Sequence, residues 1–260
     1  MDVIRDVMKD LSPLNRFIFP APKPSYSLNA RFKDASLVKI ALSPRTMYAL
    51  EYHNPSYESC IVYFHANACD LGNVSSHLHH LHKMLKVNVL APEYSGYGVC
   101  SENGGMSERR AHEMNAMCAR YLKNVRGYSP HNLFVFGRSI GTGIAMDFVH
   151  YHSLETSIGG VILHSPYRSI KSLTYDFLGI ANVFIFERFD TYAKIKTLTS
   201  PLLIVHSKND EVIPFSHAQD IYDACPSTRK VLITQRGLDH NAELSETCLE
   251  GIKLFINRIS

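Results

Sequence analysis

The sequence lacks any apolar run near the roughly 20 residues that a helix needs to cross a bilayer. Its six cysteines are widely spaced, form no C-x-x-C pair and follow no recognisable signal peptide or lipidation motif. We therefore expect reduced thiols and a cytoplasmic location, with peripheral contact to membranes left open.

The sequence also has little excess charge of either sign. The net charge is +3, from 27 Lys and Arg against 24 Asp and Glu, and no basic block is present, so we expect no nucleic-acid partner. The glycines at 137–143 lack the spacing of phosphate-binding loops, and no cofactor is expected. His77, His79, His80 and His82 place at most two side chains on one helix face, which favours a solvated face over a metal site.

With 260 residues, 45% of them hydrophobic, the chain can bury a large core. Residues 1–24 predict an amino-terminal helix and a proline-rich lead-in, and 25–260 a single α/β domain. Short apolar runs alternate with amphipathic segments, which predicts a mainly parallel central sheet covered by helices on both faces. The strands are expected at 36–42, 46–53, 60–64, 87–92, 132–136, 160–164, 202–206 and 230–234.

The run ending in Gly137-Arg138-Ser139-Ile140-Gly141 breaks from apolar residues into glycine and serine. It fits the G-x-S-x-G nucleophile elbow, in which small neighbours let the serine adopt a strained turn between a strand and a helix. The apolar spacing of 140–151 predicts that helix. Ser139 is therefore the candidate nucleophile.

A serine nucleophile needs a base, and the base needs an orienting group. Asp210 and His240 each follow a predicted strand, and the order Ser139, Asp210, His240 is that of α/β hydrolases. Glu211 and Asp239 are rivals for the acid. Three other histidines are expected to be packing or surface residues: His164, His206 and His217.

Acyl transfer also needs donors for the developing oxyanion. The backbone N–H of Ile140 is one candidate, and Asn67, after the strand at 60–64, is the other, with Ala66 as a neighbouring alternative.

Together these motifs resemble the alpha/beta-hydrolase-domain-containing seventeen group of protein depalmitoylases and their Bem46-like relatives. The resemblance covers about residue 20 to the end and rests on His65-Ala66-Asn67-Ala68-Cys69-Asp70-Leu71-Gly72, Tyr94-Ser95-Gly96-Tyr97-Gly98, Gly137-Arg138-Ser139-Ile140-Gly141-Thr142, Ile162-Leu163-His164-Ser165-Pro166, Asp210-Glu211-Val212-Ile213, Phe215-Ser216-His217 and His240-Asn241. It implies an α/β-hydrolase fold and serine hydrolysis of an acyl thioester on a palmitoylated protein, with Ser139, Asp210 and His240 catalytic and Asn67 and Ile140 as oxyanion donors.

Three features depart from the group. Ala66 stands in place of a glycine, Asp239 replaces a small residue, and the amino-terminal cysteine cluster is missing, which bears on the oxyanion turn and on membrane targeting. The segment 166–199 is unusually apolar and is expected to form a short cap, suited to an acyl chain or to packing on the domain. A small-ester carboxylesterase, a serine peptidase and a non-catalytic interaction protein are the alternative functions.

Overall fold

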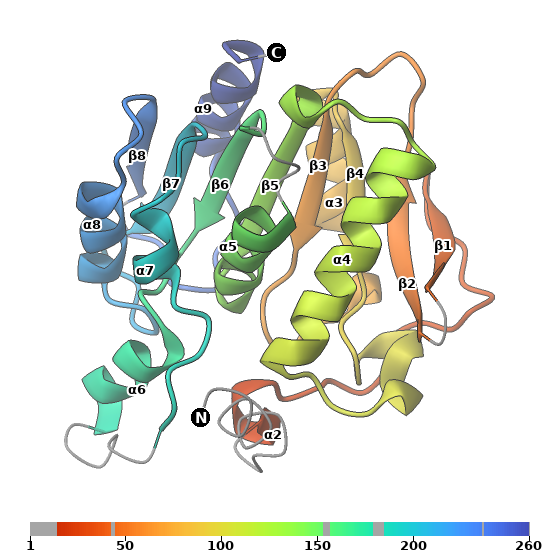
Figure 1. Cartoon of the computed structure of the whole chain (residues 1–260), viewed down its shortest axis with the longest axis horizontal. Coiled ribbons are helices and arrows are strands. Elements are labelled where there is room, and N and C mark those ends of the chain that lie inside the picture. Colours follow the sequence, from red (N-terminus) through yellow and green to blue (C-terminus); the bar gives the residue numbers. More distant parts are fainter. Residues whose placement is uncertain (1–14, 43–44, 153–156, 179–184, 236, 260) are drawn as a thin grey trace. The chain divides into compact units, whose positions relative to one another are not determined.

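A computed structural model describes residues 15–42, 45–152, 157–178, 185–235 and 237–259. It divides into two compact units, Met1–Tyr128 and Ser129–Ser260. Each unit combines strands with helices on both faces of its strands (Figure 1). None of the described helices has the length and apolar character needed to cross a membrane.

The first unit holds strands β1 (Ser36–Leu42), β2 (Arg45–Tyr52), β3 (Cys60–Phe64) and β4 (Asn88–Pro92), in the spatial order β1-β2-β4-β3. The β1–β2 and β2–β4 pairs are antiparallel, and the β3–β4 pair is parallel. Every residue of β3 and β4 is buried, as expected for strands covered on both faces.

Helices α3 (Leu71–Leu85) and α4 (Glu108–Asn124) lie on opposite faces of these strands (Figure 1). A short α2 (Asn15–Ile18) and a 3₁₀ helix, η1 (Gly98–Asn103), complete the unit's described helices. Helix α3 starts at Leu71 because Asp70 caps it in a reciprocal pair with Asn73. The predicted amino-terminal helix lies mostly outside the described residues.

The second unit contains β5 (Leu133–Arg138), β6 (Gly160–His164), β7 (Leu202–Ser207) and β8 (Lys230–Gln235) in that spatial order, all parallel. Strands β6 and β7 are buried throughout. The carboxyl ends of parallel strands share one edge of the sheet, so the loops after β5, β7 and β8 are brought to the same side.

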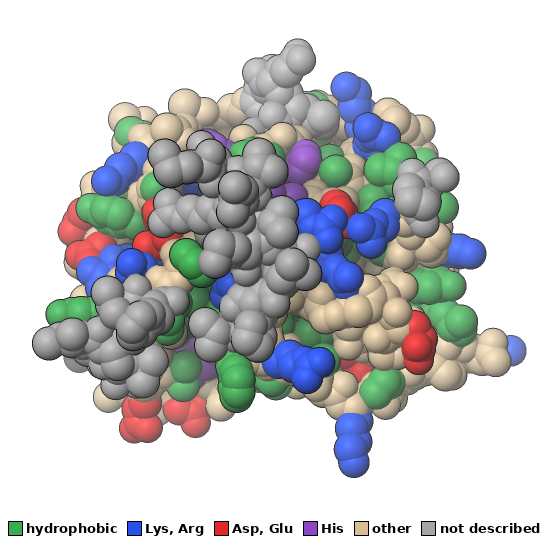
Figure 2. Space-filling model, turned by 60° about the horizontal axis from the view of Figure 1, so that its bottom comes forward, with side chains coloured by type: hydrophobic (Ala, Val, Ile, Leu, Met, Phe, Trp, Pro, Cys, Tyr) green, Lys and Arg blue, Asp and Glu red, His purple; other side chains and the backbone are tan. Residues whose placement is uncertain are grey.

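Helix α5 (Ile140–His152) follows β5 directly and lies in front of it in Figure 1, whereas α9 (Glu246–Asn257) covers the opposite face. Helices α6 (Ile170–Leu178), α7 (Thr191–Ile195) and α8 (Phe215–Ala224), with the 3₁₀ helix η2 (Pro130–Asn132), fill the other described connections. Both α6 and α7 fall in the predicted cap segment, which also includes 179–184, outside the described residues. Basic and acidic side chains are mixed on the face that Figure 2 shows.

Candidate active site

Ser139 occupies a sharp turn between β5 and α5. Its φ angle is 53°, in the left-handed region that costs energy for residues other than glycine. A Cβ atom at Gly137 would lie 2.4 Å from the Gly141 carbonyl oxygen, so the turn requires a residue without a side chain there. The Ser139 N–H donates to the His164 carbonyl oxygen at 2.9 Å, which ties the strained residue to β6.

The structure brings Ser139, His240 and Asp210 together in the second unit. His240 Nε2 lies 2.9 Å from Ser139 Oγ, and His240 Nδ1 lies 2.8 Å from Asp210 Oδ2. A carboxylate accepts from Nδ1–H, which fixes the tautomer whose Nε2 can accept the serine proton. The three side chains therefore have the geometry of a nucleophile, a base and an orienting acid.

Asp210 is kept ionised by its surroundings. Its other oxygen, Oδ1, accepts the backbone N–H groups of Val212 at 3.0 Å and Ile213 at 2.8 Å. Burial alone would raise the pKa of Asp210, but the hydrogen bonds from His240 and from these two backbone groups outweigh burial and lower the pKa to about 2.

The loop that carries His240 is held from two strands. Arg138 Nη2 donates to the carbonyl oxygens of Asn241 at 3.0 Å and Ala242 at 3.2 Å. Ser207 Oγ donates to the Leu238 carbonyl at 2.5 Å, and the Gly237 N–H donates to Asn209 Oδ1 at 2.9 Å. Sequence reasoning missed these supports, because each joins residues at least 28 positions apart.

The rival acids point elsewhere. Asp239 Oδ1 accepts the Asn241 N–H at 2.9 Å, a local turn that uses its carboxylate. Glu211 is exposed. Of the three residues considered for the acid, Asp210 is the one that contacts the His240 ring.

The other histidines of this unit have different partners. His217 Nε2 donates to Asp176 Oδ2 at 2.6 Å, which links α8 to α6, and its Nδ1 accepts the Arg168 N–H. Burial lowers the pKa of His217. His206 is fully buried, donates from Nε2 to the Ile213 carbonyl at 2.9 Å and lies 3.4 Å from Asp210 Oδ2. His206 therefore packs beside the acid, and the ring of His164 is also buried.

The two oxyanion candidates belong to different units. Ile140 is the first residue of α5, and the first N–H groups of a helix have no partner within it. In the first unit, the Asn67 side chain donates from Nδ2 to the Ile18 carbonyl at 2.6 Å, and its Oδ1 accepts from Tyr97 Oη at 2.9 Å. The Asn67 side chain is thus engaged, and the oxyanion assignment of both residues stays a prediction.

The structure describes only part of the predicted cap segment, 166–199. The side chains of Phe177 and Leu178, like residues 179–184, lie outside what the structure describes. Phe189 is fully buried and adopts a φ of 47°. An acyl-binding role for this segment stays a prediction.

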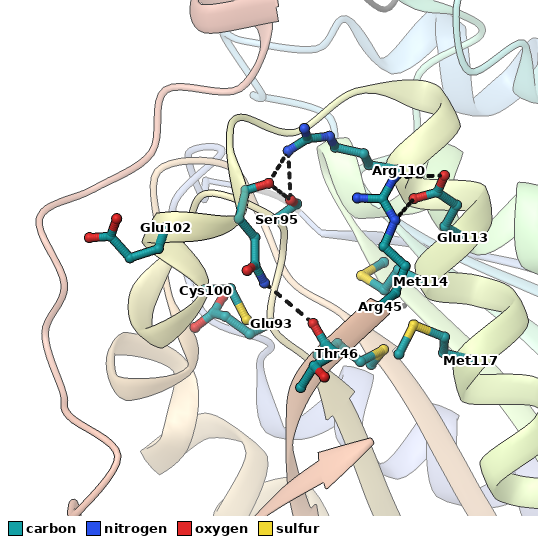
Figure 3. A pocket seen from close by; sticks show the side chains of 12 residues that line it. Arg45, Thr46, Glu93, Ser95, Cys100, Glu102, Arg110, Glu113, Met114 and Met117 are labelled. Atoms are coloured by element: carbon teal, nitrogen blue, oxygen red, sulfur yellow. Dashed lines mark hydrogen bonds and ion pairs between the residues drawn. The ribbon is translucent and has the colours of Figure 1, made fainter. Parts of the chain in front are cut away.

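Two further features of the first unit are distinct from this site. A hollow of about 290 Å³ is lined by the residues drawn in Figure 3, among which Arg110 donates to Ser95 Oγ at 3.1 Å and Arg45 pairs with Glu113 at 3.3 Å. On α3 the expected solvated face is wrong for His82, which is buried and whose Nδ1 donates to the Val87 carbonyl at 2.7 Å. Among the described residues, no three His, Cys, Asp or Glu side chains are grouped to hold a metal ion.

Solved structures share the fold of this chain. An esterase from Pyrococcus furiosus aligns with 92% of this chain and 99% of its own length, with a TM-score of 0.70 and 13% identity. A CIB-like hydrolase from Thermoplasma acidophilum aligns with 86% of this chain and 98% of its own, with a TM-score of 0.61 and 17% identity. The fold is that of the α/β hydrolases, which confirms the predicted fold class.

Curated relatives narrow the class to a family, although no protein-family model matches the chain. The putative alpha/beta hydrolase L404 of Acanthamoeba polyphaga mimivirus is 32% identical over 79% of this chain and 75% of its own length. Human alpha/beta hydrolase domain-containing protein 17B is 31% identical over 79% of this chain and 68% of its own length. The human 17C protein is 34% identical over 78% of this chain and 59% of its own length, so the chain spans about three fifths of that relative. The chain belongs to the alpha/beta hydrolase domain-containing protein 17 family, as the motifs predicted.

Replacing Arg138 by methionine should lower kcat for ester hydrolysis by about tenfold to a hundredfold with little change in KM. The change frees the carbonyl groups of Asn241 and Ala242, and small misplacements of a catalytic group have effects of this size. Steady-state kinetics on p-nitrophenyl esters measure both constants. Arg120→Met, on an exposed position of α4, is the control, and equal kinetics in the two variants would contradict a positioning role for Arg138.

The lowered pKa of Asp210 predicts a pH-dependent contribution to stability. The folded-state pKa of about 2 is below the ordinary value of 3.8, so the stabilisation is complete above about pH 4 and is lost as the pH falls toward 2. Urea unfolding of the wild type and Asp210→Asn should show a difference in unfolding free energy that shrinks across this window. A constant difference from pH 7 to pH 2 would rule out the linkage, and Asp223→Asn, at an exposed position of α8, is the control.

Proposed function

We propose that the chain is a serine hydrolase that cleaves an acyl ester or thioester through an acyl-enzyme intermediate. The observation that carries this proposal is the continuous hydrogen-bonded series from Ser139 Oγ to His240 Nε2 and from His240 Nδ1 to Asp210. A surface serine has no need of a strained φ, a glycine-only neighbour and a buried carboxylate behind its histidine partner.

In the first step Ser139 Oγ attacks the acyl carbonyl carbon while its proton passes to His240 Nε2. Asp210 stays ionised and stabilises the imidazolium that forms. The tetrahedral intermediate then expels the thiolate or alkoxide, which takes the proton from His240, and leaves Ser139 acylated. Water repeats the sequence: His240 accepts its proton, the acid departs, and the Ser139 hydroxyl is restored.

The oxyanion of each intermediate requires preorganised donors. The N–H of Ile140 at the start of α5 is the donor that follows the nucleophile in α/β hydrolases, and family membership supports a second donor from the turn after β3, where Asn67 stands. Ala66 in that turn is the departure that bears on its geometry.

For the substrate, we propose a palmitoylated protein thioester. The support is the motif resemblance to protein depalmitoylases and the apolar composition of 166–199, which suits burial of a long chain. The alternatives are a short acyl ester or a peptide amide.

Ser139→Ala should abolish labelling by a fluorophosphonate probe and lower ester turnover by about a thousandfold or more, because the nucleophile is removed. Gel fluorescence of the labelled protein and a spectrophotometric ester assay measure the two effects. Ser95→Ala in the first unit is the matched control and should label like the wild type. Labelling that survives in Ser139→Ala would refute the nucleophile, and an unreactive wild type would support the non-catalytic alternative.

A profile of acyl length tests the substrate class. With acyl-cysteine peptides of 2 to 16 carbons, kcat/KM should rise with chain length, since each buried methylene contributes about 0.8 kcal/mol of transfer free energy. The same peptides with an oxygen ester and with an amide separate thioesterase from esterase and peptidase activity. A maximum at 2 to 4 carbons would refute the long-chain assignment while leaving the serine mechanism intact.

A further inference from the structure

A groove of about 420 Å³ lies in the second unit, between α9 and the outer strands β7 and β8. Its apolar walls are formed by Leu203, Val231, Ile233, Leu254 and Phe255, among others. It sits at the amino ends of these strands, because Leu203 is the second residue of β7. At about 3.3 Å per residue, roughly 13 Å of strand separate it from Ser207, at the end where Asp210 follows.

The rim of the groove is both apolar and exposed. Val231 is 46% exposed and Leu254 is 55% exposed, and the two side chains stand on β8 and α9. At the floor, a Cβ atom on Gly251 would lie 2.4 Å from Ile233 Cδ1, so this mid-helix glycine lets α9 approach the strand closely. The groove is therefore a hollow with apolar walls and an apolar rim that is open to solvent.

All the charged residues that line the groove are basic. Arg229, Lys230 and Arg258 line the groove, and none of the residues that line it is acidic. The Lys230 ammonium donates to the Tyr222 and Cys225 carbonyls at 2.8 Å and is thereby occupied. Arg229 and Arg258 are exposed, and neither guanidinium makes a hydrogen bond or ion pair with another residue that the structure describes.

We propose that this groove binds a free long-chain carboxylate, with the hydrocarbon along the apolar walls and the head group at Arg229 and Arg258. The volume falls within the usual range of small-molecule sites, which are mostly apolar with a few placed polar groups. A guanidinium matches a carboxylate in charge and in its two-point hydrogen bonding. The site is separate from Ser139 and requires no hydrolysis.

Dodecanoate and dodecyltrimethylammonium are the test probes, because they share a chain and differ in charge. Methyl NMR of the full chain, with the resonances of Val231 and Leu254 assigned, should show both residues shifting as dodecanoate is added. Arg229→Glu/Arg258→Glu should weaken dodecanoate about tenfold or more and strengthen the cationic probe, because the charge complementarity is reversed. Lys196→Glu/Lys253→Glu, at two positions outside the lining, makes the same change in net charge and should bind like the wild type.

Thermal unfolding of each variant establishes that it is folded, and Leu254→Gln supplies a second, charge-neutral change that should also weaken dodecanoate. The proposal is overturned if dodecanoate shifts only methyl groups around Ser139, or if both probes bind equally to the wild type. It is also overturned if the groove variants change only sedimentation with anionic vesicles, or only the monomer–dimer equilibrium in ultracentrifugation. None of these readouts uses turnover, so failure of the hydrolase proposal would leave the test valid.

Discussion

The backbone at Ser139 is the constraint on which the rest of the second unit depends. A φ of 53° at a residue with a side chain costs on the order of 1–3 kcal/mol, and it persists only where neighbours enforce it. Here the N–H bonds to His164 on β6, and Thr142 returns both its N–H and its hydroxyl to the Ser139 carbonyl. The strain therefore fixes where Oγ points, before any partner is considered.

The two residues that act with Ser139 are far from it in the sequence, so the fold must bring them to it. His240 is 101 residues from Ser139 and 30 from Asp210, and it lies on a loop, the least constrained kind of segment. Arg138 resolves this directly, since the residue next to the strained serine also binds the carbonyl groups that follow His240. The turn and the base are thus held by neighbouring residues of one strand end, which couples their positions.

The predictable part of the site followed from one rule, that carboxyl ends of parallel strands meet at one edge. Together with the G-x-S-x-G motif at Ser139, this rule selected Asp210 and His240, and the structure places the three side chains within hydrogen-bonding distance. It could not find Arg138 or the ring of His206 beside Asp210, because nothing local in the sequence marks a contact made across the fold. The buried strands were predicted for a similar reason, since continuous apolar runs have few alternatives, whereas the exact start of α3 depended on a cap.

Helix α9 packs near the amino ends of β7 and β8, opposite the strand ends that carry the catalytic residues. Glycine in a helix interior is less favourable than alanine by about 1 kcal/mol, yet Gly251 stands in the middle of α9. A Cβ atom there would lie 2.4 Å from Ile233 Cδ1, so the glycine lets the helix and the strand approach without moving that side chain. Helix α9 approaches β8 closely at Gly251, whereas Val231 and Leu254 stay exposed at the rim. A groove is left between the helix and the strands. The polar catalytic residues and the apolar groove therefore lie at opposite ends of one parallel sheet.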